Sequence, residues 1–132
     1  MDEFVIQGPA RLRGEFAVPG AKNSVSKLLV ASMLSGEPSE FANVPQIEDT
    51  SATMDICRSL GTVFARKRQR ALTAHTPAMT GSQVPEDLAR RNRLSVMMLA
   101  PLLHRTGRAV IAAAGGDRIG MRPVDYHLQA YR

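Results

Sequence analysis

The sequence predicts an α/β fold built from a repeated unit of helices and strands. Segments with the apolar spacing of a helix alternate with short segments rich in β-branched or aromatic residues, which are typical of strands. A shift of 69 positions also aligns SKLLVASML at 26–34 with SVMMLAPLL at 95–103, and Phe41-Ala42 with Val110-Ile111. The pattern helix, strand, helix, strand, strand therefore returns about every 70 residues, which indicates a duplicated module whose second copy is cut short.

Turn signals and apolar spacing define the elements of the first third of the chain. Two short strands are expected at 4–6 and 12–18, each followed by a Gly-Pro or Pro-Gly turn. A helix is expected over KNSVSKLLVASMLSG at 22–36, with Gly36 in the place of a C-terminal cap. A further strand is expected at 41–44.

The middle of the chain predicts a capped helix and a hairpin. Asp49-Thr50-Ser51 supplies N-capping side chains for a helix that ends at Leu60, directly before a glycine. Strands are expected at 62–65 and 71–73. The basic segment RKRQR at 66–70 lies between them, and we interpret it as a solvated hairpin tip.

A third helix is expected from Glu86 to about Arg105, with an apolar stripe that includes Met97 and Met98. A proline inside this stretch predicts a bend at Pro101. The methionine pair is interpreted as part of the core.

Composition excludes several classes of protein. The 132 residues carry a formal charge of +5 and a sequence pI near 10.1, which favours anionic partners. Two Tyr, four Phe and no Trp offer few stacking platforms, so nucleic acid is not an expected partner. The single cysteine, Cys57, excludes an intrachain disulfide and is assigned to the core. The histidines lack metal-ligand spacing and no cofactor motif is present, so neither metal nor cofactor is expected.

The N-terminal sequence and the apolar segments predict a cytoplasmic protein. The start MDEFVIQGP has neither a basic region nor a long apolar run of the kind found in secretory signals. The longest apolar segments, such as 96–103, are far shorter than a membrane span, so no membrane association is expected.

Two predicted helices carry basic residues that could hold an anion. Lys22-Asn23 stands at a helix start, where unpaired N–H groups and the helix dipole favour negative charge. Arg93 lies with Arg90 and Arg91 in a cluster suited to bidentate capture of phosphate or carboxylate. Solvated surface side chains are the alternative at both places.

The loop AAGGDRIGMRPVD at 113–125 combines backbone freedom with charge. Gly115-Gly116 allows backbone conformations that other residues resist. Asp117 follows them, and Arg118 and Arg122 could bracket an anion beside its carboxyl group. A glycine turn with incidental charges is the alternative reading of the same residues.

Taken together, four segments resemble the amino-terminal part of the UDP-N-acetylglucosamine 1-carboxyvinyltransferases, a family of enolpyruvyl transferases. The segments are GAKNS, FANVP, RNRLSVMMLAPLL and GGDRIGMRPVD, and the resemblance spans almost the whole chain. Their order and spacing carry it, since no single segment would suffice.

The resemblance implies a cytoplasmic enzyme that transfers enolpyruvyl from phosphoenolpyruvate to the 3′-hydroxyl of UDP-N-acetylglucosamine, with release of phosphate, in peptidoglycan precursor synthesis. The family fold has two lobes built of βαβαββ units, with the site in the cleft between them. Residues 1–19 are then expected to belong with the second lobe. Residues 20–132 are expected to form an incomplete first lobe of about two units.

The resemblance also implies roles for individual residues. Lys22 and Asn23 match contacts to phosphoenolpyruvate, and Arg93 matches an arginine at the substrate site. The segment that meets the UDP-sugar comprises Arg122, Pro123, Val124, Asp125 and Tyr126, where Tyr126 departs from the usual leucine.

Asp117 occupies the position of the acid in the family's catalytic loop, which is most often cysteine. It is expected to protonate C3 of phosphoenolpyruvate as a general acid while Lys22 and the arginines hold phosphate and carboxylate in line. Neighbouring arginines should lower the pKa of Asp117, whereas bound anions should raise it. Because a carboxylate forms no thioether with fosfomycin, resistance to this antibiotic is expected.

Two further interpretations stay open. One is a truncated module that binds a nucleotide or a partner without catalysis. The other is an enolpyruvyl transferase with another acceptor, such as a nucleotide or shikimate 3-phosphate. The family's second lobe carries a further catalytic carboxylate, so little turnover is expected from these 132 residues alone. The remainder of the same protein is an expected partner, because the sequence stops within a predicted helix.

Overall fold

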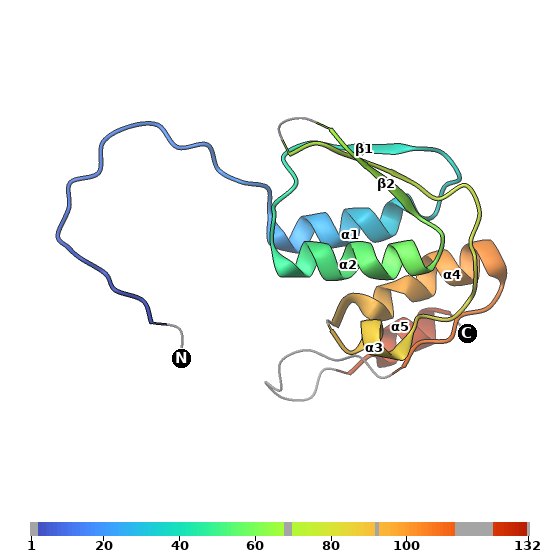
Figure 1. Cartoon of the computed structure of the whole chain (residues 1–132). Helices are drawn as coiled ribbons and strands as arrows, with labels where there is room; N and C mark the ends of the chain where they lie inside the picture. The colour runs from blue at the N-terminus through green and yellow to red at the C-terminus, as the bar shows by residue number, and fades with distance from the viewer. Residues whose placement is uncertain (1–2, 68–69, 92, 113–122, 132) are drawn as a thin grey trace.

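A computed structural model describes residues 3–67, 70–91, 93–112 and 123–131. In these residues a small sheet covers one side of two long helices, and shorter helices form a third layer on their other side (Figure 1). The N-terminal segment extends away from these layers. The predicted α/β class is confirmed.

The first repeated unit has the predicted order of helix, strand, helix, strand, strand. It consists of α1 (Lys22–Ser32), β1 (Ser39–Phe41), α2 (Glu48–Ser59), β2 (Val63–Arg66) and β3 (Leu72–His75). The strands form one antiparallel sheet in the order β1-β3-β2. The central strand buries Leu72 and Ala74 toward the helices, as expected of alternating side chains on a half-covered sheet.

The core lies between α1, α2 and the third layer. From α1 it takes Val25, Leu29 and Val30, which recur at helical spacing. From α2 it takes Met54, Ile56 and Cys57, and the sulfur of Cys57 is fully buried as predicted. Burial raises the pKa of the Cys57 thiol to about 12, so this cysteine is no nucleophile.

The predicted helix caps are wrong in two places. The helix α2 begins at Glu48 after Ile47, without a side-chain cap, so Asp49-Thr50-Ser51 lies inside its first turn. Its two acidic residues still complement the positive end of the helix dipole. At the end of α1 the capping position is Met33 in a right-handed conformation, three residues before Gly36. Short turns after Met33 satisfy the last carbonyls instead.

The predicted third helix is divided into separate pieces. These are α3 (Glu86–Ala89), the 3-10 helix η1 (Arg93–Met98) and α4 (Leu99–Thr106), followed after the loop by α5 (Asp125–Ala130). Pro101 stands in the first turn of α4, where a missing N–H costs no hydrogen bond. The repeat also predicts a strand around 110–111, as the second copy of the strand at 41–44. The structure has only a single parallel bridge there, between Gln83 and Val110.

The two N-terminal strands are absent from the structure. Phe4 and Leu12 are 92% and 93% exposed, and residues 3–20 form no strand. A strand forms only where a neighbour supplies hydrogen bonds, and the sheet offers none here. One contact to the body of the fold is the bond that Asn43 Nδ2 donates to the Val18 carbonyl, at 3.1 Å. The expectation that 1–19 belongs with a second lobe stays a prediction.

Candidate active site

Lys22 lies where the sequence predicts it, as the first residue of α1. The capping residue Ala21 is extended and provides no side-chain cap at this helix start. Lys22 Nζ forms an ion pair with Asp49 Oδ2 at 2.7 Å. The ion pair joins the first turns of α1 and α2, which both begin at the same side of the molecule (Figure 1).

Asp49 also belongs to this site, although the sequence predicts another role for it. It was expected to cap α2, yet its side chain pairs with Lys22 from the neighbouring helix. Both side chains are partly solvated, with exposed fractions of 64% and 37%. The pair therefore adds little stability, but it fixes where the lysine charge is held. Asn23 follows Lys22 and is exposed, and its carbonyl accepts a hydrogen bond from Lys27 Nζ.

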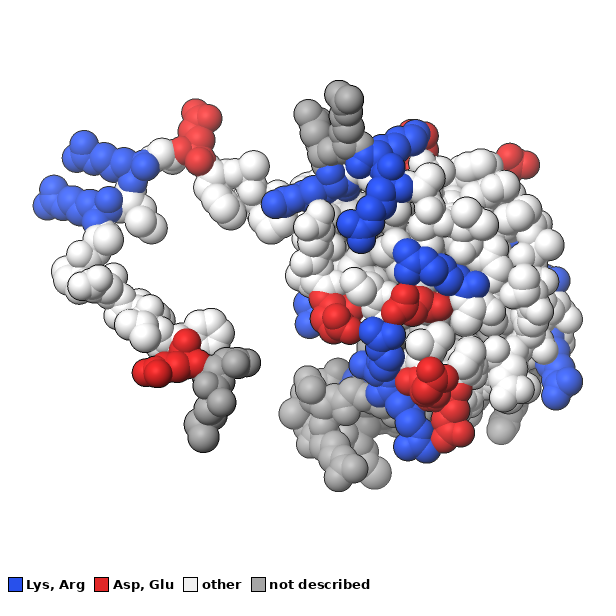
Figure 2. Space-filling view, in the orientation of Figure 1, with Lys and Arg blue, Asp and Glu red and all other residues white. Residues whose placement is uncertain are grey.

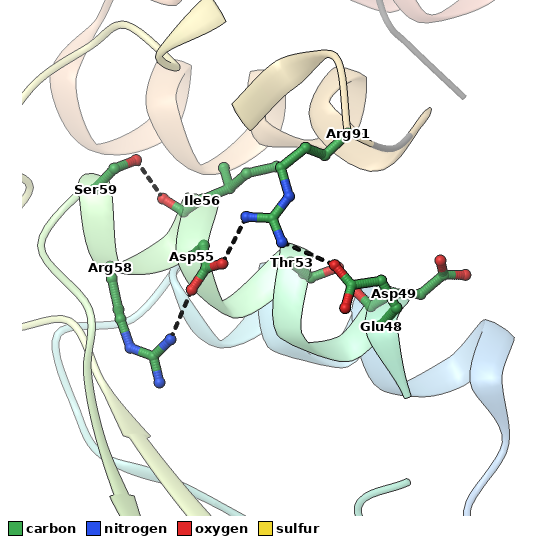
Figure 3. Close-up of polar contacts among 8 residues, drawn as sticks. All are labelled: Glu48, Asp49, Thr53, Asp55, Ile56, Arg58, Ser59 and Arg91. Atoms are coloured by element: carbon green, nitrogen blue, oxygen red, sulfur yellow. Dashed lines mark hydrogen bonds and ion pairs between the residues drawn. The ribbon is translucent and has the colours of Figure 1, made fainter. Parts of the chain in front are cut away.

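The arginine cluster separates into different roles. Arg91 Nη1 donates to Asp55 Oδ2 at 2.7 Å, and Nη2 donates to Glu48 Oε1 at 2.9 Å (Figure 3). Both carboxylates raise the pKa of Arg91, and the arginine ties the loop after α3 to α2. Arg90 Nε donates to Glu86 Oε1 one turn earlier, at 3.0 Å. These two arginines are engaged in ion pairs within the fold.

Arg93 differs from its two neighbours. It is the first residue of η1, which packs against both α1 and α2, and it is half-buried. Its Nη1 atom is buried and has no hydrogen-bond partner within the described part of the chain. A buried guanidinium N–H without an acceptor raises the free energy of the folded state. A bound anion that accepts this hydrogen bond would remove that cost.

The C-terminal part of the predicted site is only partly described. Pro123 and Val124 precede α5, Asp125 begins it, and Tyr126 is 80% exposed. Asp117, Arg118 and Arg122 lie outside the described residues.

Buried hydroxyl groups mark the packing of the two repeated helices. Ser26 on α1 and Ser95 on η1 are both buried, and neither Oγ atom has a hydrogen-bond partner among the described residues. The shift of 69 positions aligns these two serines, so the repeat could have indicated them as equivalent positions. Elsewhere in the described chain, no group of three or more His, Cys, Asp or Glu could hold a metal ion. No helix in the same residues has the length and apolarity needed to cross a membrane.

Comparison with known proteins decides the family. The sequence profile of EPSP synthase (3-phosphoshikimate 1-carboxyvinyltransferase) matches residues 6–132. The chain belongs to the EPSP synthase family. The family match covers Lys22, Arg93 and the loop that contains Asp117, which are the residues on which the resemblance rests.

Individual members of the family give the degree of similarity. The chain is 39% identical over 128 residues to the UDP-N-acetylglucosamine 1-carboxyvinyltransferase of Enterobacter cloacae, covering 97% of this chain and 30% of that protein. It is also 39% identical to the enzyme of that name from Maricaulis maris, covering 100% of this chain and 31% of the relative. The chain thus spans about a third of the length of these curated relatives.

A solved structure of the family has the same fold. The enolpyruvyl transferase NikO from Streptomyces tendae superposes with a TM-score of 0.65 at 26% identity. The match covers 74% of this chain and 22% of NikO. The layered arrangement of α1, α2 and the antiparallel sheet is therefore that of an enolpyruvyl transferase.

Proposed function

We propose that this chain forms part of an enzyme that transfers enolpyruvyl from phosphoenolpyruvate to the 3′-hydroxyl of UDP-N-acetylglucosamine and releases phosphate. The observation that carries the proposal is the buried Nη1 of Arg93, which has no acceptor in the described residues. It lies on a helix that packs against α1, whose first residue is Lys22. The names of the relatives support UDP-N-acetylglucosamine as the acceptor.

The chemistry assigns complementary roles to these side chains. Phosphoenolpyruvate carries a phosphate and a carboxylate, and Lys22, Asn23 and Arg93 supply donors for them at helix starts. Asp49 keeps the ammonium group of Lys22 in place. Holding both anionic groups fixes the orientation of the double bond, which lowers the entropic part of the barrier.

The remaining roles fall on the loop and on α5. Asp117 is proposed to protonate C3 of phosphoenolpyruvate as the general acid, and Arg122 to stabilise negative charge. Pro123, Val124, Asp125 and Tyr126 are proposed to meet the UDP-sugar. No metal or cofactor is needed for these steps, and the proposed location is the cytoplasm, where peptidoglycan precursors are made.

Phosphate release tests the proposed reaction. The reading frame is expressed up to its stop codon, and release from phosphoenolpyruvate is measured with UDP-N-acetylglucosamine, UMP or shikimate 3-phosphate. We expect release with UDP-N-acetylglucosamine alone. Release with another acceptor would change the substrate, and nucleotide binding without any release would favour a noncatalytic module.

Variants test the roles of the cations. Arg93→Met should lower kcat/KM by about a hundredfold or more, in line with the loss of one charge-stabilising donor. Lys22→Met should do the same. Arg90→Met is the matched control, because Arg90 is exposed and pairs with Glu86. An equal loss in the control would show that the cluster acts through folding.

Fosfomycin tests the role of Asp117. Full activity is expected after incubation with the antibiotic, since a carboxylate cannot form the thioether. Asp117→Cys should restore time-dependent inactivation. Inactivation of the unaltered enzyme would refute the placement of Asp117 in the catalytic loop.

A further inference from the structure

A cavity of about 360 Å³ lies beside the first turn of α2. It opens between the β2–β3 hairpin, the connection from β1 to α2 and the first turn of α2. Neither Lys22 nor Arg93 lines it. Its size is in the lower range of small-molecule sites, which are commonly about 300–1,000 Å³.

The rim of the cavity is positively charged. Arg66, Lys67 and Arg70 line it from the hairpin, and basic side chains gather beside the hairpin tip in Figure 2. Lys67 pairs with Glu40 of β1, whereas no ion pair joins Arg66 or Arg70 to another described residue. Among the described lining residues the single carboxylate is Glu48, which already pairs with Arg91. Among the described lining residues, basic side chains therefore outnumber carboxylates.

A buried hydroxyl group points to a missing hydrogen-bond partner at the same place. Thr50 lines the cavity and is 4% exposed, and its Oγ1 atom has no hydrogen-bond partner in the described part of the chain. Thr53, one turn later on α2, instead donates its hydroxyl to the Asp49 carbonyl at 2.7 Å. An unpaired buried hydroxyl is unfavourable, so a polar group in the cavity would satisfy it.

The backbone adds a second set of donors. The N–H groups of Thr50 and Ser51 bond to the Ile47 carbonyl, and the two N–H groups before them have no acceptor within the helix. Helix α2 has 12 residues, and its positive end meets the cavity. The lining also includes the apolar residues Ile47, Met54 and Leu72. The anionic part of a ligand would thus contact the N–H donors and basic side chains, and its apolar part would contact the apolar lining residues.

We propose that this cavity binds a small organic phosphate ester. Arg66 and Arg70 hold the phosphate oxygens, with the Thr50 hydroxyl as a further donor, because a doubly charged head matches several cationic and N–H donors. The apolar body of the ligand lies against Ile47, Met54 and Leu72. Neither Lys22 nor Arg93 lines this site, and its existence does not depend on the proposed reaction.

Phenyl phosphate is a suitable probe, and backbone amide shifts of the 132-residue chain report where it binds. We expect saturable shifts centred on residues 44–54, 66–67 and 70–72. Inorganic phosphate lacks the apolar body, benzyl alcohol lacks the charge, and benzoate carries a single charge. All three should bind at least about fivefold more weakly, since each loses one class of contact. Equal affinity for benzoate or benzyl alcohol would overturn the assignment of a phosphate ester.

Three variants test the residues. The double variant Arg66→Gln/Arg70→Gln should weaken phenyl phosphate at least about tenfold, through loss of charge-assisted hydrogen bonds. Thr50→Val keeps the side-chain shape and should weaken binding about threefold or more. Arg108→Gln is the matched control, because Arg108 is an exposed arginine that does not line the cavity. Its affinity should equal that of the unaltered chain.

Two results would refute the site. One is unchanged affinity in the double variant, and the other is a set of shifts centred on residues 22, 23 and 93. If the double variant fails to fold, salt provides the second measurement. Raising NaCl to about 0.5 M should weaken phenyl phosphate severalfold by screening while leaving benzyl alcohol unchanged. No salt effect would equally refute the site. Because these assays measure binding and not phosphate release, they are independent of the proposed function.

Discussion

Arg105 offers the most direct test of what holds the layers together. From α4, its Nη1 atom donates toward the carbonyls of Thr76, Ser35 and Met33 at 2.6, 3.1 and 3.3 Å. Its Nη2 atom donates to the Pro77 carbonyl at 2.9 Å. One half-buried guanidinium therefore joins α4 to the turn after α1 and to the chain that leaves β3.

The expected cost of removing this guanidinium follows from the number of bonds. Nη1 has two protons, so at most three full hydrogen bonds are counted. At about 1 kcal/mol each, Arg105→Met should lower the free energy of unfolding by about 3 kcal/mol, since methionine keeps an apolar stem and a good helix propensity. Arg105→Lys should lose about half as much, because a single ammonium group cannot reach both sides.

Urea unfolding followed by far-ultraviolet circular dichroism measures the change. With a slope of about 2 kcal/mol per molar urea, the midpoint of Arg105→Met should fall by about 1.5 M. Arg108→Met is the matched control, because Arg108 is exposed near the same helix end and its side chain has no acceptor in the described residues. A loss below about 0.5 kcal/mol in Arg105→Met, or an equal loss in the control, would refute the reasoning.

Three further predictions concern stability. Gly61 has φ +106°, and a Cβ there would lie 2.6 Å from the Ala78 carbonyl oxygen. Gly61→Ala should therefore lower the free energy of unfolding in urea by about 3 kcal/mol. Gly81→Ala is the control and should be nearly neutral, because a Cβ there meets nothing within 4 Å. Because burial raises the pKa of Cys57 to about 12, the folded state keeps its thiol proton while the unfolded chain loses it from pH 9 upward. Stability should therefore fall by roughly 1.4 kcal/mol per pH unit above pH 9 relative to Cys57→Ala, and parallel pH profiles would contradict this. Ser95→Ala removes a buried hydroxyl that has no partner among the described residues, so thermal stability should be unchanged or raised. A loss above about 1 kcal/mol would contradict this.

Local patterns predicted the parts of the fold that depend on local interactions. The apolar spacing of α1 and α2 was correct because a helix makes its hydrogen bonds within one segment. The strands at 4–6 and 12–18 were wrong because pairing depends on a partner that the segment itself does not encode. The third helix was wrong because the segment between α3 and η1 turns so that Arg91 reaches two carboxylates on α2, which no spacing along η1 reveals.

In the candidate site, too, local features were predicted from the sequence and tertiary contacts were not. The position of Lys22 at a helix start followed from the sequence, but its ion pair with Asp49 did not, because the two residues meet only when α1 and α2 pack together. Similarly, the arginine cluster was visible in the sequence. Only the packed structure separates Arg93, with its buried Nη1, from neighbours that are already engaged.

The extended N-terminal segment is accessible to proteases in the folded chain. Arg11 and Arg13 are exposed in a stretch outside the core, so cutting there requires almost no opening of the fold. Trypsin should cleave after these arginines at a rate that folding stability does not control, and the product keeps every core residue from Val25 to Leu102. Lifetime in the presence of a protease and resistance to urea are therefore two separate properties of this chain.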